Sequence, residues 1–348
     1  MDITKEIFGE TDQQSVYAFT MKNDHGMEIT CLNYGCIITK ILAPDSEGRL
    51  ENVVLGFDSL EEYRNHSPYF GAVVGRVAGR IKGGSFIIEG RNYVLPKNEN
   101  GNHLHGGFKG FNNVIWEAKV LEKENEGSVQ FTYLSPDGEE GYPGNVQISV
   151  TYTLTNTNEL VISYKGKSDQ KTLLNLTNHT YFNLSGNLRR KITDHSLKIK
   201  SDSILELNEQ LLPTGEIKSV EGTPFNFQHA RIVRDGIESD HPQILLAGNG
   251  YDHPFLLNTN HDKEIVLWDE ESGRSLTIET DEPGVVLYTG NQLDGHFKIR
   301  GVLSNPHLGL CLETQGLPDA IHHPHFPSII LDKDEQYSSV TTYQFGTL

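Results

Sequence analysis

Hydrophobic and polar residues alternate along several stretches of this chain, and the alternation constrains the fold more strongly than any other feature. In residues 146–154 the alternate positions carry Val146, Ile148 and Val150, and residues 129–133 and 160–164 repeat the pattern. A period of two is typical of a β-strand with one face in a core. Because helical patterns between these stretches are scarce, a parallel α/β fold is disfavoured. The pattern therefore predicts an all-β sandwich or barrel of antiparallel strands.

Turn-forming residues separate the expected strands. Residues 137–138 (Asp-Gly) and 156–158 (Asn-Thr-Asn) lie where hairpin turns are expected. One short helix is predicted over residues 58–65, with Asp58 or Ser59 near its N-cap and acidic residues in its first turns.

The rest of the chain offers further strands and no sign of a second domain. Residues 275–280 and 285–289 are strand candidates, whereas residues 201–240 are less periodic and predict an elaborated loop with short strands. We find no linker, low-complexity tract or repeat at a fixed period. Residues 1–348 are therefore expected to form a single domain.

Charge and cysteine content exclude several classes of protein. The net charge is 29 − 47 = −18, which argues against nucleic acid and anionic membranes as partners. Cys31, Cys36 and Cys311 are odd in number and fit no metal-binding spacing. The acidic N-terminus lacks a signal-peptide pattern, and no segment approaches the ~20 apolar residues that span a bilayer. We therefore expect a cytoplasmic protein with reduced thiols.

Residues 175–184 (Asn-Leu-Thr-Asn-His-Thr-Tyr-Phe-Asn-Leu) concentrate polar groups in a segment that otherwise resembles a strand. Leu176, Phe182 and Leu184 predict one face in a core, with the other face lining a polar cleft. Amides donate and accept hydrogen bonds, and His179 can transfer a proton near neutral pH. This combination suits a sugar better than a metal or a phosphate. The alternative is a buried histidine in a polar core patch, and the segment alone leaves both open.

Two segments nearer the N-terminus carry pairs of basic residues. Arg76 and Arg80, beside glycines, could clamp an oxygen-rich ligand or could be surface arginines next to a turn. His103 and His105 would point to the same face of a strand and could hold a metal. Zinc is disfavoured because a third ligand at a recognisable spacing is missing. Since two glycines follow His105, this segment fits a binding loop at least as well.

Two acidic residues in the C-terminal half are candidates for sugar contacts or catalysis. Asp252 could accept from two hydroxyls while Tyr251 and Phe255 pack on a sugar ring, or it could cap its own turn. Glu313 ends an apolar, strand-like run, where a carboxylate is expected to be paired or functional. Residues 321–325 (Ile-His-His-Pro-His) invite a metal assignment, but the proline and the lack of a partner ligand disfavour it.

In this order, the segments resemble the aldose 1-epimerases, the family of the galactose mutarotases. Their motifs include Asn-His-Leu-His-Gly-Gly, Tyr-Asp-His-Pro-Phe, Glu-Thr-Gln and Pro-Asp-Ala. Each motif is moderately specific, whereas the ordered set is strongly specific and spans nearly the whole chain. The matching residues are 75–81, 102–107, 175–184, 251–255, 288–291, 293–295, 313–315, 318–320 and 337–345.

The resemblance implies a large antiparallel β-sandwich with the active site in an open cleft on one sheet. It implies interconversion of the α and β anomers of a small-molecule aldohexose such as galactose or glucose, with no cofactor and no metal. By the motif matches, Glu313 would be the general base and His179 the general acid. Arg80, His105 and Asp252 would hold the sugar. The oligomeric state is left open between monomer and homodimer.

Two positions depart from the commonest family pattern, and both bear on sugar preference. Gly79 stands where many members have asparagine, and Val286 where many have a glutamine that reaches the sugar. A carboxylate with an ordinary pKa is a weak base, so we expect burial or a like-charged neighbour to raise the pKa of Glu313. We also expect nearby acids such as Asp252 to favour protonated His179.

Three other functions stay open at this point. A phosphosugar epimerase on the same fold would need extra cationic groups, for which Arg76 and Arg80 are the nearby candidates. A non-catalytic sugar-binding or sensor domain could lose the acid–base pair, whereas both His179 and Glu313 are present here. A lyase or hydrolase on a related sandwich would need a groove rich in exposed aromatic residues, which the two tryptophans do not indicate.

Overall fold

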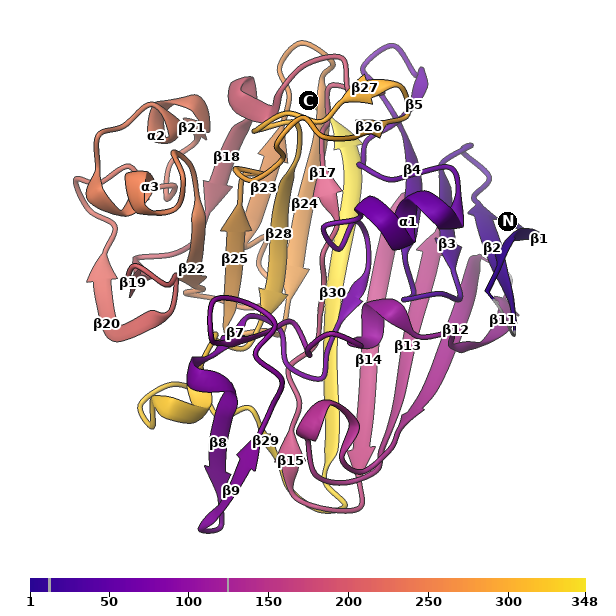
Figure 1. The fold of residues 1–348 in the computed structure, drawn as a ribbon. Helices are drawn as coiled ribbons and strands as arrows, with labels where there is room; N and C mark the ends of the chain where they lie inside the picture. The colour runs from indigo at the N-terminus through magenta and orange to yellow at the C-terminus, as the bar shows by residue number, and fades with distance from the viewer. Residues whose placement is uncertain (12–13, 124) are drawn as a thin grey trace.

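The computed structural model describes residues 1–11, 14–123 and 125–348, which form a predominantly antiparallel β-structure (Figure 1). Within them, the largest sheet has nine strands, a second has six, and a third, near the N-terminus, has five. Neighbouring strands in these three sheets pair antiparallel throughout. The expected antiparallel, all-β class is therefore confirmed.

The strands of the three sheets follow in spatial order. The largest sheet contains β11 (Glu117–Lys123), β12 (Glu126–Ser135), β13 (Val146–Thr155), β14 (Glu159–Ser168), β30 (Gln336–Thr347), β24 (Arg274–Thr280), β23 (Ile265–Trp268), β18 (Ser196–Ile199) and β21 (Arg231–Ile232). The second contains β17 (Tyr181–Phe182), β28 (Leu310–Gln315), β25 (Gly284–Tyr288), β22 (Asp252–Leu256), β19 (Ser203–Leu207) and β20 (Pro213–Ser219). The third contains β1 (Asp2–Glu10), β2 (Ser15–Lys22), β3 (Glu28–Leu32), β4 (Ile38–Pro44) and β5 (Leu50–Asn52).

Short strand pairs and helices complete the described chain. The pairs are β6 (Val73–Val74) with β16 (Thr177–Asn178), β7 (Arg80–Ile81) with β10 (His103–Leu104), β8 (Ser85–Ile88) with β9 (Arg91–Val94), β15 (Thr172–Leu173) with β29 (Ile330–Leu331), and β26 (Lys298–Ile299) with β27 (Val302–Leu303). The α-helices are α1 (Leu60–His66), α2 (Arg234–Ile237) and α3 (Pro242–Leu246). Across the described residues, no helix is both long enough and apolar enough to span a membrane.

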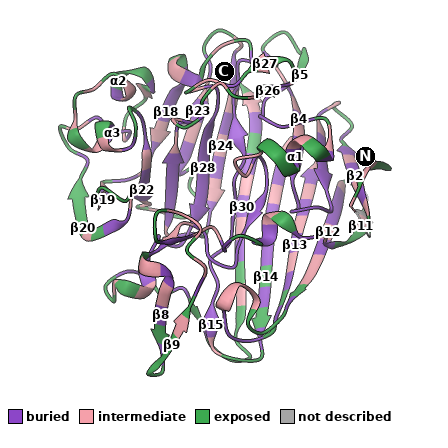
Figure 2. Cartoon of the chain, viewed as in Figure 1, coloured by how far each residue is buried: buried purple, intermediate pink, exposed green. Residues whose placement is uncertain are grey.

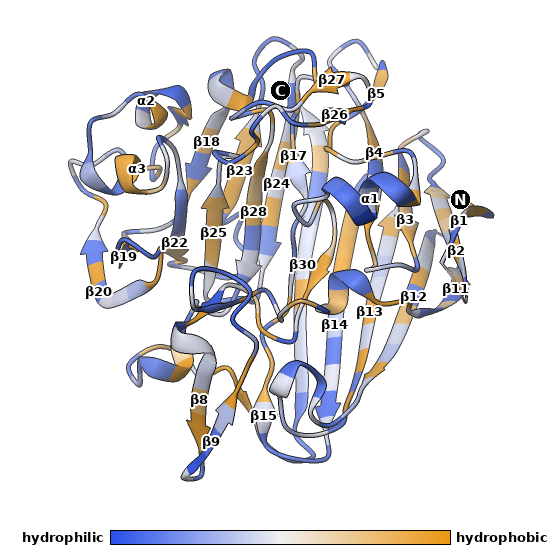
Figure 3. Ribbon diagram, in the orientation of Figure 1, coloured by the Kyte–Doolittle hydropathy of each residue, from blue (hydrophilic) through white to orange (hydrophobic). Residues whose placement is uncertain are grey.

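The two larger sheets share one hydrophobic core. Ile162 of β14 and Tyr343 of β30 belong to the same buried cluster as Leu287 of β25 and Leu312 of β28. Two sheets with one apolar face each bury those faces against each other, which gives a sandwich. Figures 2 and 3 show the underlying alternation along β13 and β14, where buried positions alternate with more exposed ones and hydrophobic residues with hydrophilic ones.

Alternation along β28 determines which side chains leave the core. Leu310 and Leu312 are core residues, so Cys311 and Glu313 lie on the opposite face of the strand. The same rule places Leu287 of β25 in the core and Val286 on the outer face. A polar residue at such a position can be buried without entering the sandwich core.

Most of the predicted local structure is present. Helix α1 begins after Ser59, whose hydroxyl accepts a hydrogen bond from the Glu62 N–H, as expected for an N-cap. Residues 156–158 connect β13 to β14. The tight hairpin predicted at residues 137–138 is wrong, because residues 136–145 form a longer connection that includes a 3₁₀ turn.

The predicted elaborated loop over residues 201–240 contains β19, β20, β21 and α2, with α3 directly after it. Strands β19 and β20 extend the six-stranded sheet beyond β22. This segment therefore builds one edge of the sheet that carries Glu313.

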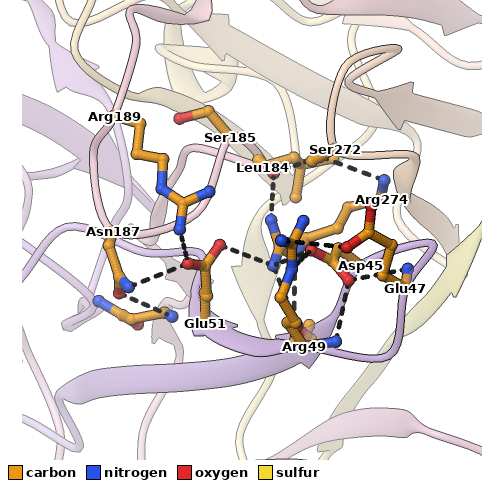
Figure 4. Close-up of polar contacts among 12 residues, drawn as sticks. Asp45, Glu47, Arg49, Glu51, Leu184, Ser185, Asn187, Arg189, Ser272 and Arg274 are labelled. Atoms are coloured by element: carbon orange, nitrogen blue, oxygen red, sulfur yellow. Dashed lines mark hydrogen bonds and ion pairs between the residues drawn. The ribbon is translucent and has the colours of Figure 1, made fainter.

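A buried ion network joins the N-terminal sheet to the largest sheet (Figure 4). Arg274 of β24 is 1% exposed, and its Nη2 lies 2.9 Å from the Glu51 carboxylate and 3.7 Å from the Asp45 carboxylate. The same guanidinium donates to the backbone carbonyls of Ala43 and Leu184. These contacts connect β4, β5 and the segment after β17 to the first residue of β24.

Candidate active site

A cavity of about 190 Å³ opens on the face of the six-stranded sheet that points away from the core. Its lining includes all five residues that the sequence predicted: Arg80, His105, His179, Asp252 and Glu313. Asp252 and Glu313 come from β22 and β28, on either side of β25, and Arg80 comes from β7, which crosses near one end of the sheet (Figure 1). Segments far apart in the chain thus meet in one polar wall.

The remainder of the lining is mostly apolar. This fits a ligand with polar edges and carbon faces, because binding pockets combine apolar walls with a few placed polar groups. These residues are Pro68, Tyr69, Gly79, Leu104, Tyr181, Leu207, Leu211, Pro213, Pro254, Val286, Tyr288, Gln292, Leu293, Gln315 and Pro318.

Glu313 and His179 form a buried pair at the bottom of the cavity. His179 Nε2 lies 3.5 Å from Glu313 Oε1, and the residues are 4% and 3% exposed. Burial raises the pKa of Glu313 well above its ordinary value, the nearby Asp252 raises it further, and Arg80 opposes both effects. The predicted rise in the pKa of Glu313, and both causes named for it, are therefore confirmed.

Aromatic rings and a thiol fix the imidazole of His179. Tyr69 and Tyr181 stack with the ring at centroid distances of 5.6 and 5.1 Å, and Cys311 Sγ lies 3.5 Å from Nδ1. Burial among these groups lowers the pKa of His179 to about 4. The expectation that Asp252 would favour protonated His179 is wrong, because the desolvation of the ring dominates.

Arg80 and Asp252 form the opposite side of the polar wall. Arg80 binds Glu99 through two hydrogen bonds, Nη2 to Oε1 at 3.0 Å and Nε to Oε2 at 3.2 Å. Its Nη1 lies 3.9 Å from Asp252 Oδ2. Burial raises the pKa of Asp252, whereas the Arg80 guanidinium lowers it. Glu99 thus holds the guanidinium plane while one edge stays directed toward Asp252 and the cavity.

His105 presents a hydrogen-bond donor to the cavity. Its Nδ1 accepts a hydrogen bond from the Gly79 N–H at 3.2 Å, so the neutral ring carries its proton on Nε2. Burial lowers the pKa of His105 well below its ordinary value, which keeps the ring neutral. The backbone of His105 has a left-handed φ of 52°, which ends the extended conformation of β10 directly after Leu104.

The site could also be considered for a metal ion. Ligand atoms of His105, His179 and Glu313 all lie within 4.8 Å of one another. However, the Gly79 N–H occupies Nδ1 of His105 and leaves the proton on Nε2, which therefore has no free lone pair for a metal. The donor set fits hydroxyl groups better than a cation.

Comparisons with known proteins agree with this geometry. The family model described as aldose 1-epimerase matches residues 17–344. The chain belongs to this family. It is 42% identical over 351 residues to a galactose mutarotase from Bos taurus, covering 99% of both chains. It is 34% identical over 342 residues to an aldose 1-epimerase from Escherichia coli strain K12, covering 96% of both.

A solved structure also resembles this chain over nearly its whole length. The galactose 1-epimerase from Lactobacillus acidophilus NCFM superposes with a TM-score of 0.90 at 30% identity, covering 99% of both chains. The predicted family, the mutarotase-like β-sandwich and the isomerase class are therefore confirmed.

Two basic residues singled out from the sequence lie outside the epimerase cavity. Arg76 is 2% exposed and donates to Ser135 and to the carbonyls of Pro136, Pro143 and Gly144, so it is neither a ligand clamp nor a surface arginine. His103 does not share a face with His105. It is fully buried, and its ring bonds the Pro96 carbonyl and the Tyr142 hydroxyl.

The amides of residues 175–184 support the epimerase site instead of lining it. Asn175 donates to the Gly316 carbonyl, Asn178 to the Gly71 carbonyl and Asn183 to the Leu308 carbonyl. The predicted strand is also wrong as one element, because only the short strands β16 and β17 form there. From this segment, His179 and Tyr181 line the cavity.

The aromatic residues of the cavity differ from the predicted ones. Tyr251 is fully buried, donates to the Pro224 carbonyl and belongs to the core, as does Phe255. Tyr69, Tyr181 and Tyr288 line the cavity instead. The sequence around Tyr69 carries no motif that could have found it. Its left-handed φ of 66° is a conformation that non-glycine residues rarely adopt outside special sites.

Proposed function

We propose that this protein is an aldose 1-epimerase that interconverts the α and β anomers of hexoses such as galactose and glucose. The observation that carries the proposal is the buried Glu313–His179 pair, 3.5 Å apart, at the bottom of a cavity that can hold a small polar ligand. Relatives named galactose mutarotase, 41–42% identical over 99% of this chain, support the choice of sugar.

The roles of the polar residues follow from what each side chain offers a sugar. Arg80 and the Nε2–H of His105 donate hydrogen bonds, and Asp252 accepts them from hydroxyls. We assign these residues to sugar binding, Glu313 to the general base and His179 to the general acid. Because the binding residues and the acid–base pair lie in one cavity, a bound ring can place its anomeric carbon beside the pair.

The reaction needs two proton transfers at adjacent oxygen atoms. Glu313 takes the proton of the anomeric hydroxyl while His179 gives a proton to the ring oxygen, the C1–ring-oxygen bond breaks, and C1 becomes an aldehyde carbon. Rotation about C1–C2 then presents the other face of the aldehyde. Ring closure reverses both transfers, so each residue returns to its starting state.

The electrostatics of the pair favour one of the two protonation states in this cycle. The reactive state has a carboxylate and an imidazolium, and ring opening converts it to a carboxylic acid and a neutral imidazole, with the proton count of the pair unchanged. Burial favours the second, uncharged state, since it raises the pKa of Glu313 and lowers that of His179. Proton transfer in the ring-opening direction therefore removes two buried charges.

The chain is proposed to act as one domain over residues 1–348, which the family match over residues 17–344 supports. We propose a cytoplasmic location, supported by three buried cysteines that form no disulfide among the described residues. A monomeric or homodimeric state stays a prediction.

The first test compares galactose with its 6-phosphate. Among the described cavity-lining residues, Arg80 is the only lysine or arginine, and it already faces Glu99 and Asp252. We therefore expect the protein to accelerate the change in optical rotation of fresh α-D-galactose much more than that of its 6-phosphate. Preference for the phosphate would support a phosphosugar epimerase, and binding of galactose without acceleration would support a non-catalytic sugar-binding protein.

A further inference from the structure

The segment directly after β28 carries the Pro-Asp-Ala motif and the histidines of residues 321–325, and the reaction uses none of them. Asp319 is 0% exposed, and its backbone has a left-handed φ of 56°. A buried carboxylate in a conformation that non-glycine residues seldom adopt indicates a specific local role.

Asp319 holds the strand that carries Arg80. Its backbone N–H donates to the Arg80 carbonyl at 3.1 Å, and its Oδ1 accepts from the Lys82 N–H at 3.0 Å. On the other edge, β7 pairs with β10. Strand β7 has only two residues. In a larger sheet a further strand would hydrogen-bond the backbone groups on its free edge, and here Asp319 makes those hydrogen bonds.

One histidine is hydrogen-bonded to the Asp319 carboxylate, and a second lies close to it. His322 Nδ1 donates to Oδ1 at 2.6 Å, and His323 Nε2 lies 3.7 Å from Oδ2, which has no hydrogen-bond partner among the described residues. His322 therefore orients the Asp319 carboxylate. The metal assignment considered for residues 321–325 has no support in this arrangement.

The same segment reaches the opposite wall of the cavity. His325 Nε2 donates to the Gly215 carbonyl of β20 at 2.9 Å, and β20 begins at the cavity-lining Pro213. Pro318, which precedes Asp319, lines the cavity beside Gly79. The turn after β28 therefore contacts both the Arg80 strand and the β19–β20 edge.

We propose that Asp319 is a positioning residue for Arg80: it fixes β7 so that the guanidinium meets the sugar in a productive position. The inference rests on the proposed sugar-binding role of Arg80. Arg80 moves no proton in the reaction, so loss of its position is expected to weaken sugar binding more than the chemical step.

Asp319→Ala removes the acceptor for the Lys82 N–H. We expect KM for galactose to rise about tenfold and kcat to change by less than about threefold, because a misplaced binding group lowers affinity for the ground and transition states together. Asp319→Asn keeps an oxygen that accepts from Lys82, so its KM is expected to stay within about threefold of the wild-type value.

A second substitution tests the same contact from its other side and keeps Asp319 in place. Lys82→Pro removes the donated N–H, and proline suits this position because Lys82 begins a 3₁₀ turn and Ile81 before it is extended. We expect its KM to rise in the same direction as that of Asp319→Ala. Asp269→Ala is the matched control, since Asp269 is buried, accepts from the Ser272 N–H and lies 3.7 Å from His195, outside the cavity.

A double-mutant cycle separates positioning from general stability. In an Arg80→Lys background, Asp319→Ala is expected to raise KM by less than about twofold further, because both substitutions act on the same contact between the side chain at position 80 and the sugar. If Arg80→Lys raises KM while Asp319→Ala and Lys82→Pro leave it unchanged, the positioning role is overturned and the role of Arg80 stands. If all three leave KM unchanged, the proposed sugar contact of Arg80 fails as well.

Discussion

At His179, several neighbours act on one imidazole ring. Tyr69 and Tyr181 stack with it, Cys311 Sγ contacts Nδ1, and Glu313 lies beside Nε2. The thiol is uncharged, since burial raises the pKa of Cys311 well above its ordinary value. A neutral partner on Nδ1 orients the ring without stabilising the imidazolium, which suits the general-acid role proposed for His179.

A second buried acid outside the cavity gives a prediction for stability. Glu282 is 8% exposed, and burial together with the neighbouring Asp281 raises its pKa from 4.5 to about 7, against a hydrogen bond from the Tyr337 hydroxyl that lowers it. Between these values the folded protein binds more protons than the unfolded chain, so the contribution of Glu282 to stability falls as pH rises. Glu282→Gln should abolish this loss, and its unfolding free energy relative to wild type should rise by about 1 kcal/mol or more from pH 5 to pH 8.

Urea unfolding of both proteins at the two pH values measures the effect. Taking the difference between variant and wild type cancels the titration of the buried histidines. Exposed Glu221 is the control, and Glu221→Gln should show no such pH dependence. Equal shifts in the two variants would mean that Glu282 ionises normally in the folded protein.

At the scale of elements, alternation predicted the strands of the largest sheet but not the local form of residues 175–184. The pattern found β12, β13 and β14 because their side chains alternate between core and surface. In residues 175–184 both faces are buried, and the amides bond to backbone carbonyls of distant segments. Such partners, like Glu99 for Arg80, depend on tertiary contacts, and the periodicity of a local sequence does not predict these contacts.

The ion network of Arg274 gives a prediction at this scale. Arg274→Met would leave the Glu51 and Asp45 carboxylates without their buried partner, although Glu51 keeps Arg189 and Asp45 keeps Arg49. We expect a loss of about 3 kcal/mol in unfolding free energy, at the low end for a broken buried pair, because of these remaining partners. Arg49→Met, at an exposed position of the same network, should have a much smaller effect. Equal losses in the two variants would show that burial of Arg274 adds nothing to the unfolding free energy.

At the scale of the whole molecule, the sandwich explains why the proposed acid–base pair of Glu313 and His179 can be buried and still reach a ligand. One face of the six-stranded sheet packs in the core, and the other carries Asp252, Val286 and Glu313 beneath loops from the first third of the chain. The ordered motifs were sufficient to predict Arg80, His105, His179, Asp252 and Glu313 as neighbours. They did not predict the apolar wall from β19 and β20, because residues 201–240 carry no regular period.

The most direct test of Glu313 as the base is the rate of α-D-galactose mutarotation by Glu313→Gln at saturating sugar, compared with wild type. We expect a fall in kcat of at least about a hundredfold with the fold intact, because the variant lacks the proposed general base. Circular dichroism and sugar binding by calorimetry would confirm that the variant is folded and still binds galactose. A kcat close to the wild-type value would contradict the assignment of Glu313 as the base.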